Sequence, residues 1–166
     1  GAFAYVTHLF TSDVSIIDTA TNTVVDTIPL ALPPSGLAIT PNGAFVHVTG
    51  SDFRTGSSAI MVIDTATNTL VDTVPLPAQS DPGGIVFTPN GAFAYVTNPD
   101  PDTLTVIDVA TSTVAATVPV TAPGCRIDDL RVGGREPDQF VDMLKVRTPR
   151  RSNHRKASRS DLLEQG

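Results

Sequence analysis

The residues of this chain that could do acid–base or metal chemistry are few and lie far apart. Residues 1–120 contain ten Asp, one Arg (Arg54) and two His, but no Glu, Lys or Cys. The two histidines, His8 and His47, do not form a His-x-His or His-x₃-His pair, the spacing that would indicate zinc. His8 lies at the end of an expected strand, where a metal or catalytic role is conceivable. His47 stands where other copies of a repeated motif have tyrosine, so we expect it to lie in the core or between neighbouring repeats.

Aspartates could indicate calcium, and three of them recur at the same place in a repeated motif: Asp18, Asp64 and Asp108. A calcium loop needs several oxygen ligands within a short span. Regular recurrence instead favours a carboxylate that accepts hydrogen bonds from the amides of a turn. The segment NPDPD, residues 98–102, comes nearest to a calcium loop through Asp100 and Asp102.

Other catalytic motifs are missing from the sequence. The TGSS segment after Arg54 lacks the Gly-Lys-Ser/Thr ending of a phosphate loop, and no Gly-x-Ser-x-Gly nucleophile elbow occurs. Cys125 is the single cysteine, which excludes an intrachain disulfide and a zinc site built from cysteines. We therefore predict no catalytic, cofactor-binding or metal-binding residue, and no cofactor.

The charge of the chain changes sharply near residue 121. Residues 1–120 carry a net charge of 1 − 10 = −9, whereas residues 121–166 carry 10 − 7 = +3, which together give the overall −6. A shift of this kind indicates a domain boundary. We predict one unit at 1–120 and a separate basic segment at 121–166, partly helical or disordered.

The elements that would position any site come from a motif that occurs three times. Each copy begins with GAF, at Gly1, Gly43 and Gly91, and each contains four short runs rich in Val, Ile, Thr and aromatic residues. The copies are 42 and 48 residues apart, and we assign the six extra residues to two loops. No run in residues 1–120 shows the 3.6-residue period of a helix. The expected strands are 2–7, 14–18, 23–28, 36–40, 44–49, 59–64, 69–74, 84–88, 92–97, 103–108 and 113–118.

Turn chemistry separates these runs. TPNG places Pro and Asn at the centre of a tight hairpin turn, with Gly where a positive φ is expected. DTATNT places Asp18 where it can cap turn amides, and Asn22 where a left-handed conformation is easy. Phe3 and Tyr5 point to one side of the first run and Ala4 and Val6 to the other, so both faces are apolar. Four strands in every 40–50 residues or so, buried on both faces, indicate a propeller blade.

The stretch PNGAFAYVTN…LTVIDVATSTVAATVPV resembles the YVTN-type β-propeller repeat. The resemblance covers residues 1–120; the tetrad is intact at Tyr95–Asn98 and varied at Tyr5–His8 and His47–Gly50. It implies an all-β fold of about three four-stranded antiparallel blades that form an incomplete ring. It also implies a surface-layer-like or lactonase-like relative in an extracellular, periplasmic or cell-surface location.

The first blade is expected to lack its innermost strand, the counterpart of Gly36–Thr40 and Gly84–Thr88. Three blades form an arc whose two end faces need a neighbour. The expected partner is therefore other polypeptide, either the remaining blades or another copy of the chain. No apolar run approaches the length of about 20 residues that spans a membrane.

The segment after residue 120 departs from the repeat. Cys125–Val132 alternates like a strand but carries charges, and a short helix is expected after Asp138. The run 147–159 is rich in Arg and Lys, which could indicate a nucleic acid or anionic surface but is also typical of a solvated, mobile tail. A third interpretation is that this segment is not the authentic continuation of the propeller.

Two classes of function stay open. The first is a non-catalytic propeller module that acts as a scaffold or recognition surface. The second is part of a lactonase-like propeller enzyme, which would need charged and His residues gathered at one place. The scarcity of such groups favours the first.

Overall fold

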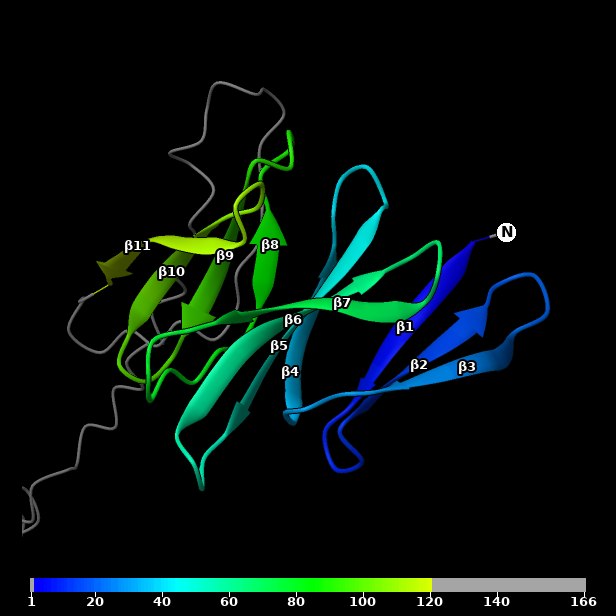
Figure 1. The fold of residues 1–166 in the computed structure, drawn as a ribbon, viewed down its shortest axis with the longest axis horizontal. Coiled ribbons are helices and arrows are strands. Elements are labelled where there is room, and N and C mark those ends of the chain that lie inside the picture. The colour runs from blue at the N-terminus through cyan, green and yellow to red at the C-terminus, as the bar shows by residue number, and fades with distance from the viewer. Residues whose placement is uncertain (1, 121–166) are drawn as a thin grey trace, which may run out of the picture.

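The computed structural model describes residues 2–120, and this part of the chain is all-β, without a helix. Its eleven strands form three antiparallel sheets, which lie side by side in the order of the chain (Figure 1). We call them blades 1, 2 and 3. Blade 1 contains β1 (Phe3–His8), β2 (Asp13–Asp18) and β3 (Thr23–Pro29). Blade 2 contains β4 (Pro34–Ile39), β5 (Phe45–Asp52), β6 (Ser57–Asp64) and β7 (Thr69–Pro75). Blade 3 contains β8 (Ile85–Phe87), β9 (Phe93–Asn98), β10 (Thr103–Asp108) and β11 (Thr113–Pro119).

This arrangement confirms the predicted order of antiparallel strands, including a first blade with three strands in place of four. Within each complete blade the strand order is the chain order, from β4 to β7 and from β8 to β11. The expectations for Cys125–Val132, for a helix after Asp138 and for the basic run 147–159 concern residues that lie outside the described range.

One expectation about the insertions is wrong. The sequence pattern assigns the four extra residues of blade 2 to a loop, but they lengthen the β5–β6 hairpin, whose pairing continues to Asp52 and Ser57. The loop that follows has four residues, 53–56, the same number as the equivalent loops 9–12 and 99–102. Because side chains along a strand alternate with period 2, adding two residues to each strand preserves the faces of the sheet.

The turns form as their residue types predict. The Oδ1 atom of Asp64 accepts hydrogen bonds from the backbone N–H groups of Ala66, at 2.8 Å, and Thr67, at 3.0 Å. Asp18 and Asp108 accept the equivalent bonds in blades 1 and 3. The turn-capping role of the three aspartates is therefore confirmed. The left-handed residues of these turns are also in place, with φ values of 54° at Asn22, 54° at Asn68 and 52° at Ser112.

The outer strands β3 and β7 carry features that block their free edges. The N–H of Thr73 points away from β6 and donates to the carboxylate of Asp72 at 2.8 Å, and Thr27 donates to Asp26 at 2.8 Å in the same way. The next outward position is Pro29 or Pro75, which has no N–H to donate. In β11 the position of these aspartates is occupied by Ala116, although Pro119 is retained.

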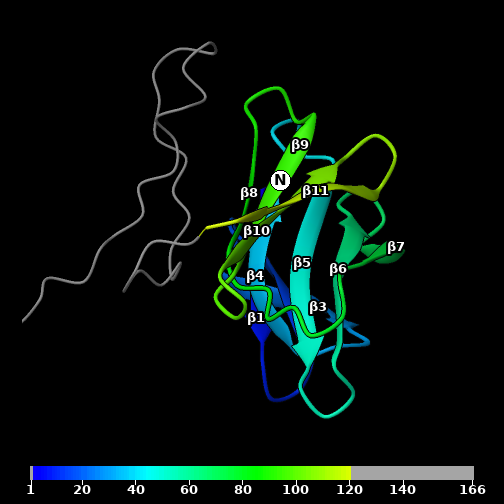
Figure 2. The same ribbon diagram turned by 90° about the vertical axis from the view of Figure 1, so that its left-hand side faces the viewer.

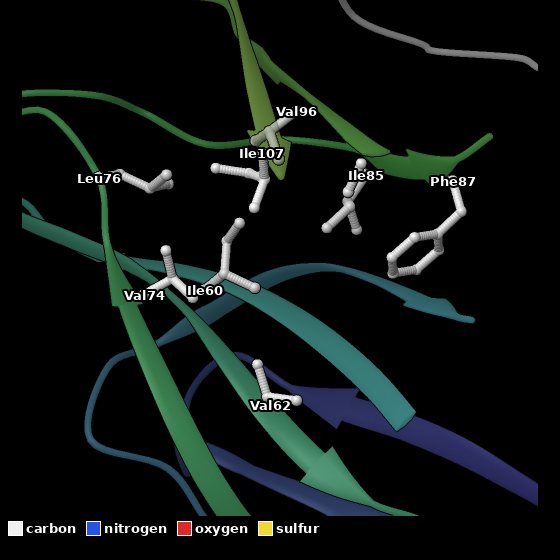
Figure 3. Close-up of a cluster of buried hydrophobic side chains, with 9 residues drawn as sticks. Ile60, Val62, Val74, Leu76, Ile85, Phe87, Val96 and Ile107 are labelled. Carbon is white, nitrogen blue, oxygen red and sulfur yellow. The ribbon is translucent and has the colours of Figure 1, made fainter. Parts of the chain in front are cut away.

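The hydrophobic core lies between the blades. The blade 2–3 core joins side chains of β6 and β7 to side chains of β8, β9 and β10 (Figure 3): Ile60, Val62, Val74, Leu76, Ile85, Phe87, Ala94, Val96 and Ile107. The blade 1–2 core has the same construction: Val14, Ile16, Ile28, Leu30, Val46, Val48, Met61 and Ile63. Figure 2, seen from the blade 3 side, shows blade 3 in front of blade 2. Each blade is thus stabilised by burying its faces against its neighbours.

The inner strands approach so closely that glycine is required at one position. The N–H of Gly36 donates to Thr49 Oγ1 at 2.8 Å, and the Thr49 hydroxyl donates to the carbonyl of Gly83 in the next blade at 2.8 Å. A Cβ atom at Gly36 would collide with the Gly83 carbonyl oxygen. Thr49 therefore links β5 to the entry of the next blade, and Gly36 leaves the space for that link.

His47 is buried in blade 2, as expected, where its ring meets the ring of Phe87 edge-on with centroids 4.9 Å apart. Its side chain is 4% exposed and its Nδ1 atom has no hydrogen-bond partner. Burial lowers the pKa of His47 from 6.5 to about 4, because the protonated imidazole would lose its hydration. The negative charge of Asp72 partly opposes this lowering of the pKa.

Gly36→Ala should destabilise the fold by about 1–3 kcal/mol, because the added methyl group must displace the backbone of the neighbouring blade. The control is Gly43→Asn, since Gly43 has a φ of 73° and open space where a Cβ atom would lie, and asparagine tolerates such a φ. Urea denaturation measures both free energies of unfolding. Equal values for the two variants would contradict the close approach of the blades.

The pKa of His47 predicts a pH-dependent stability. The unfolded chain binds a proton at His47 near pH 6.5, and the folded chain only near pH 4. The contribution of the neutral, buried His47 to the free energy of unfolding is therefore fully present above pH 6.5. It is lost as the pH falls towards 4, by up to about 3 kcal/mol. His47→Tyr, which introduces the residue found in blades 1 and 3, should flatten this part of the profile in urea melts between pH 7.5 and pH 4. The control is His8→Asn, at the exposed histidine. This variant should still lose stability as the pH falls towards 4, because His47 is intact.

Candidate functional site

The hairpin loops of the three blades lie at one edge of the molecule. Strands β1, β5 and β9 occupy equivalent places in their blades and run towards the same side, the lower side of Figure 1. The loops that follow them, residues 9–12, 53–56 and 99–102, together with the linker Gln79–Asp81, form what we call the loop edge. The N–H of Gln79 donates to the carbonyl of Gly56 at 3.2 Å, and that of Asp81 to the carbonyl of Asp100 at 3.3 Å. These bonds hold the linker between the hairpins of blades 2 and 3.

A surface hollow of about 160 Å³ lies at this junction. Its walls come from the lengthened β5–β6 hairpin, from the linker and from the β9–β10 loop: Ser51, Asp52, Phe53, Gly56, Ser57, Gln79, Ser80, Asp81 and Asp100. Both insertions contribute to the walls of the hollow. The lengthened β5–β6 hairpin reaches the lengthened linker, where the N–H of Gln79 binds the carbonyl of Gly56. The hollow therefore depends on the two insertions that interrupt the strict repeat.

The hollow is acidic. Three of the residues that line it are aspartates: Asp52, Asp81 and Asp100. The backbone N–H of Arg54, followed by its guanidinium, lowers the pKa of Asp52 below its usual value, so this carboxylate is ionised at neutral pH. The Arg54 Nε lies 3.5 Å from Asp52 Oδ1, but the side chain is 91% exposed. Since Arg54 is the one basic residue in residues 1–120, the loop edge keeps a net negative charge.

Large apolar side chains of the loop edge are exposed to solvent, and one of them lines the hollow. Phe53 is 79% exposed and lines the hollow, while Phe10 in the blade 1 loop is 99% exposed and its neighbour Leu9 is 53% exposed. Neither phenylalanine belongs to a hydrophobic core, so both rings leave apolar surface in contact with water. These exposed apolar residues were not predicted from the sequence. The signal that could have found them is a phenylalanine placed inside a four-residue hairpin turn.

The β9–β10 hairpin, which contains Asp100 and Asp102, holds a second group of polar atoms. Asn98 is fully buried, and its Nδ2 atom donates to Thr103 Oγ1 at 3.1 Å and Thr105 Oγ1 at 2.9 Å. The Oδ1 atoms of Asn98 and Asp102 are buried and have no hydrogen-bond partner. Nevertheless, no three Asp, Glu, His or Cys side chains converge as a metal site anywhere in residues 2–120. The geometry therefore gives no support to calcium binding at this loop, which was the nearest candidate in the sequence.

The structure keeps the two histidines apart. His8 is exposed at the end of β1, where its Nε2 atom is 2.9 Å from Ser15 Oγ, and His47 is buried in blade 2. The capping aspartates lie at the β2–β3, β6–β7 and β10–β11 turns, at the opposite ends of the strands from the loop edge. Thus the loop edge brings together acidic and aromatic side chains, but neither histidine lines its hollow. In the described part of the chain no helix is long and apolar enough to cross a membrane.

Comparison with protein-family models and with curated proteins finds no match. Comparison with solved structures finds β-propeller proteins. Hydrazine synthase from Kuenenia stuttgartiensis is 23% identical, with a TM-score of 0.61 over 70% of this chain and 32% of that one. U3-55K is 14% identical, with a TM-score of 0.60 over 70% of this chain and 36% of that one. A structure of the Dos1 propeller is 11% identical, with a TM-score of 0.55 over 66% of this chain and 27% of that one. The chain spans about a third of the length of these structures. At such identities the likeness shows the fold alone: the described residues are blades of a β-propeller.

Proposed function

We propose that this chain is a non-catalytic module of a YVTN-type β-propeller, and that its loop edge recognises a polypeptide. The observation that carries the proposal is the exposed ring of Phe53 beside the acidic hollow. Interfaces are enriched in aromatic residues that contribute most of the binding energy, and charge around them selects the partner. The complementary partner is a segment that carries both an apolar side chain and basic side chains.

The rigid part of the molecule suits this role. Blades held together by two inter-blade cores position the hairpin loops, so little order has to be gained when a partner binds. The resemblance of the YVTN repeat supports a location at the cell surface, in the periplasm or outside the cell. No observation favours the alternative, a lactonase-like enzyme, since the loop edge assembles neither a histidine nor a group of metal ligands among the described residues.

Two labelled peptides test the proposal. The first has the sequence of residues 147–160, with six Arg or Lys and no aromatic residue. The second carries Ser152→Trp and Ser158→Trp in the same peptide. We expect the tryptophan peptide to bind the full-length chain more tightly in fluorescence anisotropy, because it matches both the charge and the apolar surface of the loop edge.

In the protein, Phe53→Ser should weaken binding of the tryptophan peptide by roughly tenfold or more, the effect of losing an aromatic anchor. Asp81→Asn should weaken binding of both peptides, and most strongly at low salt. The matched control is Val71→Ser, because Val71 is 52% exposed on the outer strand of the same blade. Equal binding by Phe53→Ser and the parent protein would contradict the proposed surface. Turnover of a lactone by the purified chain would contradict the non-catalytic assignment.

A further inference from the structure

The two end faces of the three-blade array are open at positions that are buried inside it. Val48 in blade 2 and Val96 in blade 3 are fully buried, whereas Val6, the same residue of the repeat in blade 1, is 41% exposed. On the opposite side of the blades, Ile28 and Val74 are 6% and 2% exposed, whereas the equivalent Val118 in blade 3 is 44% exposed. The exposed residues therefore occupy positions that form interfaces between blades elsewhere in the array.

The two faces can be defined from the internal contacts. The receiving face is the side on which a blade meets the blade before it, and in blade 3 it consists of Ala94, Val96, Thr105 and Ile107. The donor face is the side on which a blade meets the blade after it, and in blade 2 it consists of Ile60, Val62, Val74 and Leu76. Seven of these eight residues belong to the blade 2–3 core, and Thr105 is fully buried.

The open faces at the two ends repeat this internal pair almost residue for residue. The receiving face of blade 1 matches that of blade 3 at three of four positions, with Ser15 in place of Thr105: Ala4, Val6, Ser15 and Ile17. The donor face of blade 3 consists of Leu104, Val106, Val118 and Val120. Among these, Val106 and Val118 occupy the positions of Val62 and Val74 in blade 2. Leu104 is already buried, so the open part of this face is centred on Val118. Blade 2 is different, since its receiving face contains the long side chain of Met61.

A polar contact between blades recurs in the same way. The hydroxyl of Tyr5 in blade 1 donates to Asn68 Oδ1 in blade 2 at 3.1 Å, which joins a donor face to the turn of the following blade. Tyr95 in blade 3 occupies the position of Tyr5, and Asn22 in blade 1 occupies that of Asn68. In blades 2 and 3 the corresponding residues are His47 and Ser112.

We propose that the donor face of blade 3 binds the receiving face of blade 1 in a second copy of this chain, head to tail. This inference rests on the proposed function, because it takes contact with polypeptide as the role of the module and names one partner. The contact is heterologous, so each copy contributes two different surfaces. The blocked outer edges of β3 and β7 direct association to the faces of the blades and away from the outer edges of these two strands.

The test is a pair of full-length variants, each with one charged face. Val6→Asp charges the receiving face and keeps Val118, whereas Val118→Asp charges the donor face and keeps Val6. Size exclusion with light scattering over a concentration series should show association of the parent beyond its 17.4 kDa mass. Each variant alone should have an apparent dissociation constant at least about 30-fold higher, because a carboxylate would be buried without a partner. Circular dichroism checks that both variants keep the β-sheet content of the parent.

Mixing the two variants gives the decisive result. One unchanged donor face and one unchanged receiving face remain in the mixture, so a 1:1 complex of about twice the chain mass should form at the parent's affinity. An association between like faces would instead persist in one variant alone and would not be restored by mixing. That result, or a parent that stays monomeric at every concentration, would overturn the proposal.

Phe53→Asp separates this inference from the proposed function. Phe53 is 79% exposed at the loop edge and lies on neither end face. This variant should lose peptide binding and still associate as the parent does. Conversely, Val6→Asp and Val118→Asp should still bind the tryptophan peptide. Loss of self-association in Phe53→Asp would overturn the head-to-tail contact, whereas unchanged peptide binding in that variant would count against the proposed function only.

Discussion

Face-to-face burial between neighbouring sheets is the interaction on which the rest of this structure depends. Each blade is a single sheet, and one sheet cannot enclose its own apolar side chains. The blade 1–2 core and the blade 2–3 core are therefore built from two blades each, and both faces of blade 2 are covered. This requirement explains why the chain repeats a motif and why both sides of its strands are apolar. It also explains why Val96 is buried in blade 3 whereas Val6, at the equivalent position of blade 1, is exposed.

The loop edge is free to vary because the cores determine the rest. The turns opposite it keep a capping aspartate in all three blades, and the strands keep their pairing. In contrast, the three loops of the loop edge share a length of four residues and little else. Their sequences place Phe10, Phe53 and Asp100 in loops where none of the three side chains belongs to a hydrophobic core. This variation at one edge of a constant scaffold is consistent with the recognition surface that we propose.

The strands, the three sheets and the turn-capping role of Asp64 could be predicted from the sequence, because each depends on local patterns. The same patterns occur at equivalent positions in all three copies of the repeat, which strengthens the prediction. It did not predict the longer β5–β6 hairpin, since an insertion of four residues is compatible with a longer loop or with two more residues in each strand. It also missed the acidic hollow, which forms where Gln79 meets Gly56 and Asp81 meets Asp100. Contacts between segments distant in the sequence leave no periodic signal. The core position of His47 was predictable because tyrosine occupies the same place in the other copies.

The outer strands have a further consequence. In β3 and β7 the aspartate that binds its neighbour's N–H removes the donor that another strand would use, and the following proline supplies none. Ala116 cannot do this in β11, so the outward N–H of Thr117 lacks that protection. An unprotected strand edge is where misfolded chains add to one another in cross-β aggregates. We therefore expect concentrated chains to pair first at the outer edge of blade 3, and Ala116→Asp should give this edge the protection that β3 and β7 have.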